Sequence, residues 1–427
     1  MNIVIALLIF GLIVTFHELG HFLIAKKNGI DVSEFSVGMG PRLFSFQKGG
    51  TRYSLKLFPI GGSCMMNEDD VEVKEGSFNS KGVWARISTI FAGPFFNFIL
   101  AFLLALIVVG NVGYDPAVIL SVPEGSTAQE VGLKEGDIIT KFNGENIVFS
   151  RDVQMELQFS PIQSLQPIPI TVERDGEEIS INMTPSYEKR PMLGFYYDPS
   201  TNVVSSVTKG SAMDEAGVKA QDKICGINGV TINLEYTLAD YLVEHPLAEE
   251  SVELQYEHNG KIITSTLTPR MTENFGIGFG YNVGYQRTDF FETIRYSIGE
   301  VRYWIEVTIK SLGQLITGKV GTDDLGGPVR IVSELGNVVE AKDEIGMKYV
   351  ILNLINWAIL LSANLGVMNL VPIPALDGGR LLFLFIEAVR GKPIDREKEG
   401  FIHGIGFILL MVLMVFLFFN DIKNVFF

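Results

Sequence analysis

Four apolar segments constrain this chain more than any other feature of its sequence. They cover residues 3–25, 88–110, 350–371 and 401–420. Each reaches the length of roughly 20 residues that a helix needs to cross a bilayer. A backbone in hydrocarbon must satisfy its own hydrogen bonds, so such segments fold as helices. We therefore expect a polytopic α-helical membrane protein with four transmembrane helices.

The first apolar segment contains the pentapeptide His17-Glu18-Leu19-Gly20-His21. Two His four positions apart on a helix lie on one face, so both can bind one zinc ion. Glu18 between them can act as a general base in peptide hydrolysis. A chance match on an amphipathic soluble helix is the alternative, but polar residues in an apolar helix are costly without a function. The segment lacks the basic start and the cleavage site of a signal peptide, so we expect it to be retained.

Charged residues between the segments predict their orientation. Nine Lys and Arg lie in 26–87 and five in 380–398, and short basic loops stay in the cytoplasm. Residues 113–286 hold 11 Lys and Arg against 25 Asp and Glu. We expect this acidic part outside the membrane, with no nucleic-acid partner, because nucleic acid needs a basic surface. Cys64 and Cys225 then lie on opposite sides of the membrane, and we expect no disulfide.

Residues 31–66 alternate in a β-like pattern, and Gly49-Gly50 supplies a turn between two such runs. We expect a hairpin or small sheet. Its hydrophobic side chains favour packing against the membrane or dipping into it near the first helix, and an ordinary cytoplasmic hairpin is an equal alternative. Cys64 at its end is more consistent with a packed thiol than with a zinc ligand.

Residues 115–280 contain an internal repeat with an offset of 84 to 85 residues, which indicates two tandem β-rich domains. The order of its landmarks, with a nearby apolar-Gly-apolar triplet, resembles the PDZ modules of bacterial membrane and periplasmic proteases. Such modules bind extended chains or C-termini by strand addition. A purely steric role is the alternative, and the sequence does not decide which triplet, 112–114, 193–195 or 277–279, forms each binding loop. The landmarks of the first copy are Gly125-Ser126, Gly132, Asp137 and Asn143-Gly144.

The third apolar segment ends in a stretch that carries a carboxylate, Asp377, before Gly378-Gly379. Two prolines there stop the helix, and the two glycines let the backbone pack closely around the groups that Asp377 contacts. Two His and one carboxylate with an open fourth position are typical of catalytic zinc. Asp377 and His17 both lie toward the cytoplasmic ends of their helices, so they can meet. An Asp that caps the following helix is the alternative.

Three other stretches predict packing rather than chemistry. Gly93 permits close helix contact, and Asn97 on the same segment should face protein, which helix packing explains. Apolar residues from Phe291 to Leu312 recur at spacings of three and four and predict an amphipathic helix. His403 is more consistent with an interfacial residue than with a ligand.

Taken together, these motifs resemble the bacterial site-2 proteases of the RseP/RasP type, which are intramembrane zinc metalloproteases. The resemblance runs essentially from end to end. The chain departs from the pattern at Ser63-Cys64, where relatives often carry an aromatic residue. The matching elements are TFHELGHF at 15–22, PIGG at 59–62, FAGPFFN at 91–97, GGP at 326–328 and NLVP…LDGG at 369–379.

The resemblance implies the roles of individual residues. The hairpin at 31–62 would present the substrate as an extended strand, and Asn369 would hold the substrate backbone or the oxyanion. By motif position, the zinc ligands would be His17, His21 and Asp377, the catalytic base Glu18, and the substrate-binding residues Asn369, Gly61 and Gly62.

The resemblance also implies a function. The protein would cut the membrane segments of single-span membrane proteins, such as anti-sigma factors already shortened by a site-1-type protease, and remnant signal peptides. It would lie in the bacterial inner membrane, with PDZ domains outside and the active site toward the cytoplasm. A non-catalytic PDZ scaffold is the alternative, although a scaffold has no use for Glu18; a zinc transporter would need a second gate.

These inferences give nine regions in chain order. We expect a transmembrane helix with HExxH at 1–27, a cytoplasmic or membrane-dipping β-hairpin region at 28–87, transmembrane helix 2 at 88–112, PDZ domains at 113–197 and 198–284, amphipathic helices at 285–347, transmembrane helix 3 with the LDG motif at 348–380, a cytoplasmic loop at 381–400 and transmembrane helix 4 at 401–421.

Overall fold

The computed structural model describes residues 2–67, 75–199, 201–233, 235–282, 284–318, 326–342 and 346–426. The chain divides into two compact units. One unit combines Met1–Pro116 with Val283–Phe427, and the other is Ala117–Asn282. The first unit contains the long apolar helices, and the second contains the internal repeat.

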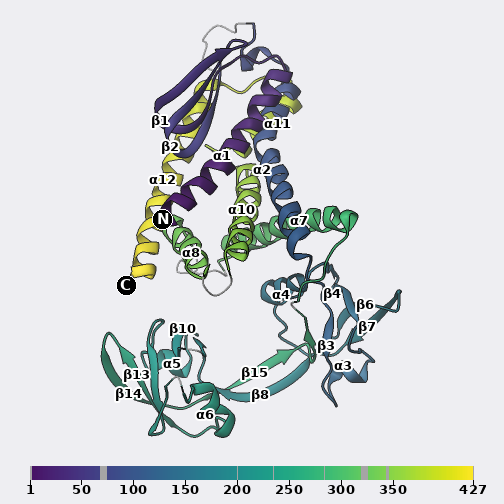
Figure 1. Cartoon of the computed structure of the whole chain (residues 1–427), viewed down its shortest axis with the longest axis vertical. Coiled ribbons are helices and arrows are strands. Elements are labelled where there is room, and N and C mark those ends of the chain that lie inside the picture. The colour runs from purple at the N-terminus through teal and green to yellow at the C-terminus, as the bar shows by residue number, and fades with distance from the viewer. Residues whose placement is uncertain are drawn as a thin grey trace. The chain divides into compact units, whose positions relative to one another are not determined.

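Four helices in the described part of the chain are long and apolar enough to cross a membrane. They are α1 (Asn2–Lys27), α2 (Val83–Val112), α10 (Met347–Leu370) and α12 (Arg396–Phe426). The four apolar helices predicted from the sequence are therefore confirmed, with ends that lie within about six residues of the predicted ones. Helix α2 packs against both α1 and α10 (Figure 1).

Small side chains bring α2 and α10 together. Ala101 and Ala105 of α2 and Ala363 of α10 are fully buried in one cluster. Small residues at a helix interface let two backbones approach closely. Such close packing favours helix association in a membrane, where lipid tails are as apolar as the side chains and the hydrophobic effect does not drive helices together. Helix α12, in contrast, exposes most of its apolar side chains, as a helix that faces lipid would.

The described residues of this unit also form three shorter or amphipathic helices: α7 (Phe290–Ile316), α8 (Pro328–Glu340) and α11 (Asp377–Arg390). Helix α7 covers the predicted amphipathic stretch and packs on α2 and α10. Its first turn is fixed by Asp289 and Glu292, each of which accepts a hydrogen bond from the other's backbone N–H. Helix α11 occupies half of the range 381–400, the predicted cytoplasmic loop between the third and fourth apolar segments. It forms because Leu381 and Leu384 are buried against α1 and α2.

The predicted hairpin consists of β1 (Val32–Lys48) and β2 (Thr51–Met66), joined by Gly49-Gly50. Both strands bend, so β1 pairs with β2 twice. Residues 42–48 pair with 51–56 beside the turn. Residues 34–37 pair with 52–55 on one side, and residues 32–37 pair with 62–66 on the other. The segment 62–66, called the edge segment below, pairs with β1 along one edge in this register, and its other edge faces α1. A short 3₁₀ helix, η1 (Phe78–Ser80), precedes α2.

The second unit repeats one order of elements around two hydrophobic cores. In each copy a short helix follows the GS pair, and a second helix lies between two antiparallel strand pairs. The first copy comprises β3 (Ile119–Ser121), α3 (Thr127–Glu130), β4 (Ile138–Phe142), β5 (Glu145–Asn146), α4 (Ser150–Phe159), β6 (Ile168–Arg174) and β7 (Glu177–Met183). The second comprises β10 (Val203–Val207), α5 (Ala212–Glu215), β11 (Lys223–Ile227), β12 (Val230–Thr231), α6 (Leu238–Glu244), β13 (Val252–His258) and β14 (Lys261–Leu267).

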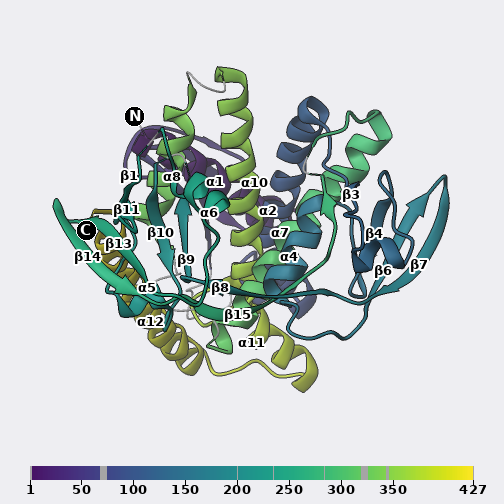
Figure 2. The same ribbon diagram turned by 90° about the horizontal axis from the view of Figure 1, so that it is seen from below.

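The two copies exchange chain segments. Strand β8 (Ser186–Met192) pairs along its whole length with β15 (Arg270–Gly276), as Figure 2 shows. After β8 the chain enters the second copy as β9 (Phe195–Asp198), with Leu193 in that core. After β15 it returns to the first copy as β16 (Gly280–Tyr281), with Phe279 in the first core.

This exchange assigns two of the three apolar-Gly-apolar triplets that the sequence left open. The triplet 193–195 belongs to the second core and 277–279 to the first. The third, 112–114, belongs to neither, because Val112 ends α2 and Tyr114 pairs with Gln286 in the first unit.

Candidate metal centre

Helix α1 presents His17 and His21 on one face, as the i, i+4 spacing predicts. Both side chains are buried, and their Nε2 atoms lie 3.1 Å apart. Two imidazole nitrogens this close in an apolar helix point at one common position.

A sharp turn after α10 brings Asp377 to the same position. Its Oδ2 lies 3.0 Å from Nε2 of His17 and 3.3 Å from Nε2 of His21. The turn depends on the glycines that follow, because an added Cβ at Gly378 would collide with the carbonyl oxygens of the residues that end α10. Ala375 adopts a left-handed backbone conformation within the same turn, with φ of 79°. The structure thus brings the three predicted ligands together from two elements 356 residues apart in sequence.

The chemistry of this donor set fits zinc. The ligand atoms of His17, His21 and Asp377 all lie within 4.8 Å of one another. Oδ2 of Asp377 is buried and has no hydrogen-bond partner among the residues that the structure describes. A buried carboxylate oxygen without a donor is costly, and a cation between the three groups would satisfy it. Two imidazoles and one carboxylate are a ligand set of catalytic zinc.

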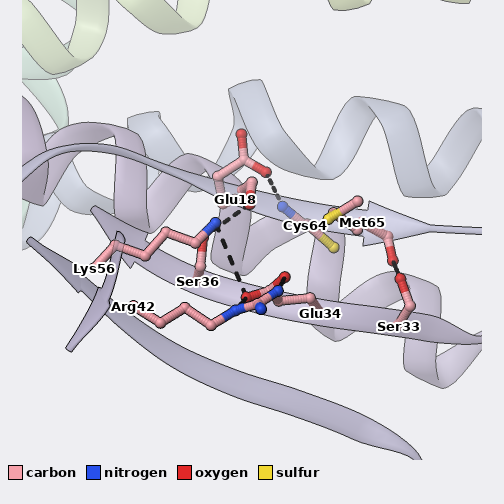
Figure 3. Close-up of polar contacts among 9 residues, drawn as sticks. Glu18, Ser33, Glu34, Ser36, Arg42, Lys56, Cys64 and Met65 are labelled. Carbon is pink, nitrogen blue, oxygen red and sulfur yellow. Dashed lines mark hydrogen bonds and ion pairs between the residues drawn. The ribbon is translucent and has the colours of Figure 1, made fainter. Parts of the chain in front are cut away.

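Glu18 lies beside this cluster and is held by the hairpin. The backbone N–H of Cys64 donates a hydrogen bond to Oε2 of Glu18 at 2.8 Å (Figure 3). Gly62 of the same edge segment passes directly over the Glu18 side chain, since an added Cβ there would lie 3.5 Å from its Cγ. The carboxylate is therefore fixed by a backbone group next to the predicted ligands.

An ion pair braces the hairpin behind this contact (Figure 3). Arg42 donates two hydrogen bonds to the buried carboxylate of Glu34, at 2.9 and 2.7 Å. Lys56 adds a third charge, with its Nζ 4.0 Å from Oε1 of Glu34. The Arg42 guanidinium lowers the pKa of Glu34 to about 2. The two arms of β1 are thus tied to each other across β2.

Helix α2 supports the two His from behind, a contact that the motifs on α1 do not predict. Nδ1 of His21 donates to the backbone carbonyl of Thr89 at 2.9 Å. Gly93 has no side chain because an added Cβ would collide with the ring of His21 and press on that of His17. Nδ1 of His17 faces the side-chain amide of Asn97. The spacing of these three α2 residues, four and four, was the signal in the sequence, since it gives one stripe on a helix.

The structure describes the surroundings of the other residues singled out from the sequence. Gly61 is buried with φ of 76°, a conformation that favours glycine. Asn369 is half-buried near the end of α10. The Cys64 thiol packs in a hydrophobic cluster, so its contact with Glu18 comes from the backbone and not from sulfur. Nδ1 of His403 accepts a hydrogen bond from the backbone N–H of Ala375 and thereby ties α12 to the turn before Asp377.

A comparison with known proteins gives the family. The sequence profile of Peptidase family M50 matches residues 5–413 of this chain. The chain belongs to peptidase family M50. Relatives similar to it along essentially their whole length include "Zinc metalloprotease RasP" of Geobacillus kaustophilus, which is 34% identical over 100% of this chain and 98% of its own. "Regulator of sigma-W protease RasP" of Bacillus subtilis is 31% identical, with 100% and 99% covered. "Probable protease eep" of Enterococcus faecalis is also 31% identical, with both chains covered in full.

Family membership decides between the classes of function that the sequence left open. The protein is a zinc metalloprotease of the RseP/RasP type, and the scaffold and transporter alternatives are not needed. The cluster on α1 and α11 carries the HExxH motif and a carboxylate, which is the chemistry that such an enzyme requires.

Proposed function

We propose that this M50 peptidase hydrolyses peptide bonds within the membrane segments of single-span membrane proteins that another protease has already shortened. The observation that carries the proposal is the position of the cluster. His17, Glu18 and His21 lie in a helix whose composition suits a membrane interior, and Asp377 reaches His17 and His21 from the turn that follows another such helix. A protease with its active residues in such helices acts on substrates in the same environment.

In this proposal His17, His21 and Asp377 hold the metal. When bound there, zinc would act as a Lewis acid toward the scissile carbonyl and would make water more acidic. Glu18 takes the proton from the attacking water and then delivers it to the leaving amine. The Cys64 N–H keeps the Glu18 carboxylate aimed at the cluster throughout.

The edge segment 62–66 provides a place for the substrate backbone. A substrate helix must unwind before its carbonyls can be attacked, and each freed backbone group in a dry site needs a partner. Pairing with a strand edge supplies such partners. In this proposal Gly61 and Gly62, which lie next to Met39 and Glu18, belong to the substrate-binding segment, and Asn369 would hold the substrate backbone or the oxyanion. Exposed apolar side chains on the hairpin suit contact with lipid; they include Leu43, Phe44, Leu57, Phe58 and Ile60.

The location and the partners are part of the same proposal. The basic segments would lie in the cytoplasm and the acidic unit at 117–282 outside the inner membrane, as a pair of PDZ domains that excludes substrates with a bulky outer domain. The name of the Bacillus subtilis relative, regulator of sigma-W protease, supports anti-sigma factors as substrates. Remnant signal peptides are single-span segments of the same kind.

The test uses the purified protein in proteoliposomes with a single-span substrate that lacks its outer domain. Mass spectrometry of the products locates the cut. We expect cleavage inside the apolar segment by the wild type and none by Glu18→Gln. Cleavage only outside the apolar segment, or equal cleavage by both proteins, would refute the proposal.

A further inference from the structure

Three residues of α2 form a single stripe that faces the two His of α1. Thr89, Gly93 and Asn97 are spaced by four residues, so they lie above one another on one face of the helix. Thr89 contacts His21, and Asn97 contacts His17. Gly93 lies between them, where an added Cβ would meet both rings. The stripe therefore matches the HExxH face residue by residue.

The orientation of each ring determines where its proton must be when a metal is bound. Nε2 of both His faces Asp377, so Nε2 is the nitrogen that would bind the metal. A neutral imidazole that binds a cation through Nε2 carries its proton on Nδ1 and must donate it to an acceptor. His21 has such an acceptor in the carbonyl of Thr89, which can only accept.

For His17, the side chain of Asn97 lies opposite Nδ1, as the Thr89 carbonyl does for His21. Nδ1 of His17 lies 3.2 Å from the amide nitrogen of Asn97. The amide oxygen of Asn97 is buried without a hydrogen-bond partner in the described part of the chain. The two ends of a carboxamide have the same shape, and rotation by 180° exchanges them. With the oxygen toward His17, Asn97 accepts the Nδ1 proton.

We infer that Asn97 is a positioning residue of the metal centre, whose amide oxygen accepts the Nδ1–H of His17 and fixes the tautomer and the ring orientation needed for metal binding. The inference rests on the proposed ligand set of His17, His21 and Asp377. An amide suits this position because its nitrogen can also donate to Nδ1 when no metal is bound and the proton has moved to Nε2. A hydrocarbon side chain could serve neither tautomer.

Packing between α2 and α10 is a separate property of the same residue. The backbone carbonyl of Asn97 accepts a hydrogen bond from Oγ of Ser362 at 2.8 Å, and both residues are completely buried. Because this contact uses the backbone, every substitution of the Asn97 side chain keeps it. Ser362→Ala removes it and leaves the amide in place, which separates helix packing from the contact with His17.

The experiment measures zinc affinity by competition with a chelator for the full-length protein in detergent. The variants are Asn97→Leu, which has no acceptor, Asn97→Asp, which keeps one, and Ser362→Ala. Loss of such an outer partner typically lowers metal affinity about 10- to 100-fold. We expect that loss in Asn97→Leu, near-wild-type affinity in Asn97→Asp because the carboxylate accepts the same proton, and no change in Ser362→Ala.

The visible spectrum of the cobalt-substituted protein provides a second readout that does not depend on activity. Asn97→Leu should change the ligand-field bands, whereas Ser362→Ala should not. The unfolding midpoint of the metal-free proteins shows whether Asn97→Leu is folded. If it is not, Asn97→Ser, which retains a smaller hydroxyl acceptor, is compared with Asn97→Ala by the same two readouts.

Two results would overturn the inference. One is unchanged zinc affinity and an unchanged cobalt spectrum in Asn97→Leu; the other is an equal loss in Asn97→Leu and Asn97→Asp, which would indicate packing alone. Asp377→Ala distinguishes failure of the inference from failure of the proposed ligand set. If Asp377→Ala loses zinc and Asn97→Leu does not, only the role of Asn97 is wrong. If Asp377→Ala binds zinc like the wild type, the ligand set itself is wrong.

Discussion

The backbone N–H of Cys64 donates a 2.8 Å hydrogen bond to the carboxylate of Glu18, a residue 46 positions earlier in the chain. The hairpin thereby holds the predicted catalytic base through a main-chain group that most substitutions at position 64 would keep. This explains how an aliphatic or aromatic residue could replace Cys64 without loss of the contact.

Removal of that N–H should slow the reaction and leave the metal centre intact. Cys64→Pro has no backbone donor, and an edge strand tolerates proline. A hydrogen bond to a charged group contributes about 1.5–3 kcal/mol, so we expect kcat to fall roughly 10- to 100-fold. Cys64→Ala keeps the N–H and should cleave like the wild type. Equal rates in both variants, measured by cleavage of the shortened substrate, would show that the contact does not position Glu18.

Gly93 should tolerate no side chain. An added Cβ would collide with His21, so Gly93→Ala should displace the ring and remove most of the bound zinc. Gly404→Ala on α12 is the matched control, because nothing lies within 4 Å of its Cβ position. Zinc per chain, measured by mass spectrometry of the metal, should fall in the first variant and stay unchanged in the second. Full zinc in Gly93→Ala would mean that α2 does not support the site as closely as the structure indicates.

The first repeat of the acidic unit should depend on one buried ion pair. Nε of Arg174 lies 2.6 Å from Oδ1 of Asp137, which is only 1% exposed. Burial alone would raise the pKa of Asp137, but Arg174 and the backbone N–H of Lys134 hold it below its usual value. Arg174→Met leaves the carboxylate unpaired and should cost about 3 kcal/mol, the low end for buried pairs, since the Arg174 side chain is partly exposed.

The pH dependence of this contribution follows from the lowered pKa of Asp137. The ion pair stabilises the fold above the unfolded-state pKa, and its contribution is lost as the pH falls through the lower folded-state value. The unfolding midpoints of wild type and Arg174→Met should therefore differ most near pH 7 and approach each other below pH about 4. A constant difference across this range would show that the substitution acts through packing instead. Asp137→Asn combined with Arg174→Met should recover part of the lost stability.

Deletion of the acidic unit should widen the range of substrates. Tyr114 and Gln286 form a pair of backbone hydrogen bonds, at 3.0 and 2.7 Å, so the chain ends that flank the unit lie side by side. A short Gly-Ser linker from residue 116 to residue 284 can replace residues 117–283. If the unit excludes large outer domains, this protein will cut an unshortened substrate that the wild type leaves intact. An unshortened substrate that stays intact would contradict the filter, and Glu18→Gln in the same background controls for other proteases.

The parts of the site that could be predicted are those fixed by local spacing or by membrane depth. The i, i+4 relation of His17 and His21 is a property of any helix. Asp377 could be paired with them because it ends an apolar segment on the same predicted side of the membrane. The apolar segments themselves were predictable, since length and composition alone determine whether a helix can cross a bilayer.

The parts of the site and the fold that could not be predicted depend on strand register and on contacts between elements that are distant in sequence. The contact of Cys64 with Glu18 requires the bend and the double pairing of β1 with β2, which no local pattern encodes. Asn97 was interpreted as a packing residue because its partner lies on another helix. Helix α11 occupies half of the range 381–400, which the sequence predicts only as the cytoplasmic loop between two apolar segments, although Leu381 and Leu384 have the spacing of a buried helix face.

In this account His17, His21 and Asp377 hold a zinc ion, and Glu18 acts as the general base without binding the metal. The most direct measurement is zinc per chain in the purified wild type, Glu18→Gln and Asp377→Asn after equal exposure to a chelator. We predict about one zinc in the wild type and in Glu18→Gln, and a clear loss in Asp377→Asn. Equal zinc in all three proteins, or zinc lost from Glu18→Gln but kept in Asp377→Asn, would contradict the assignment.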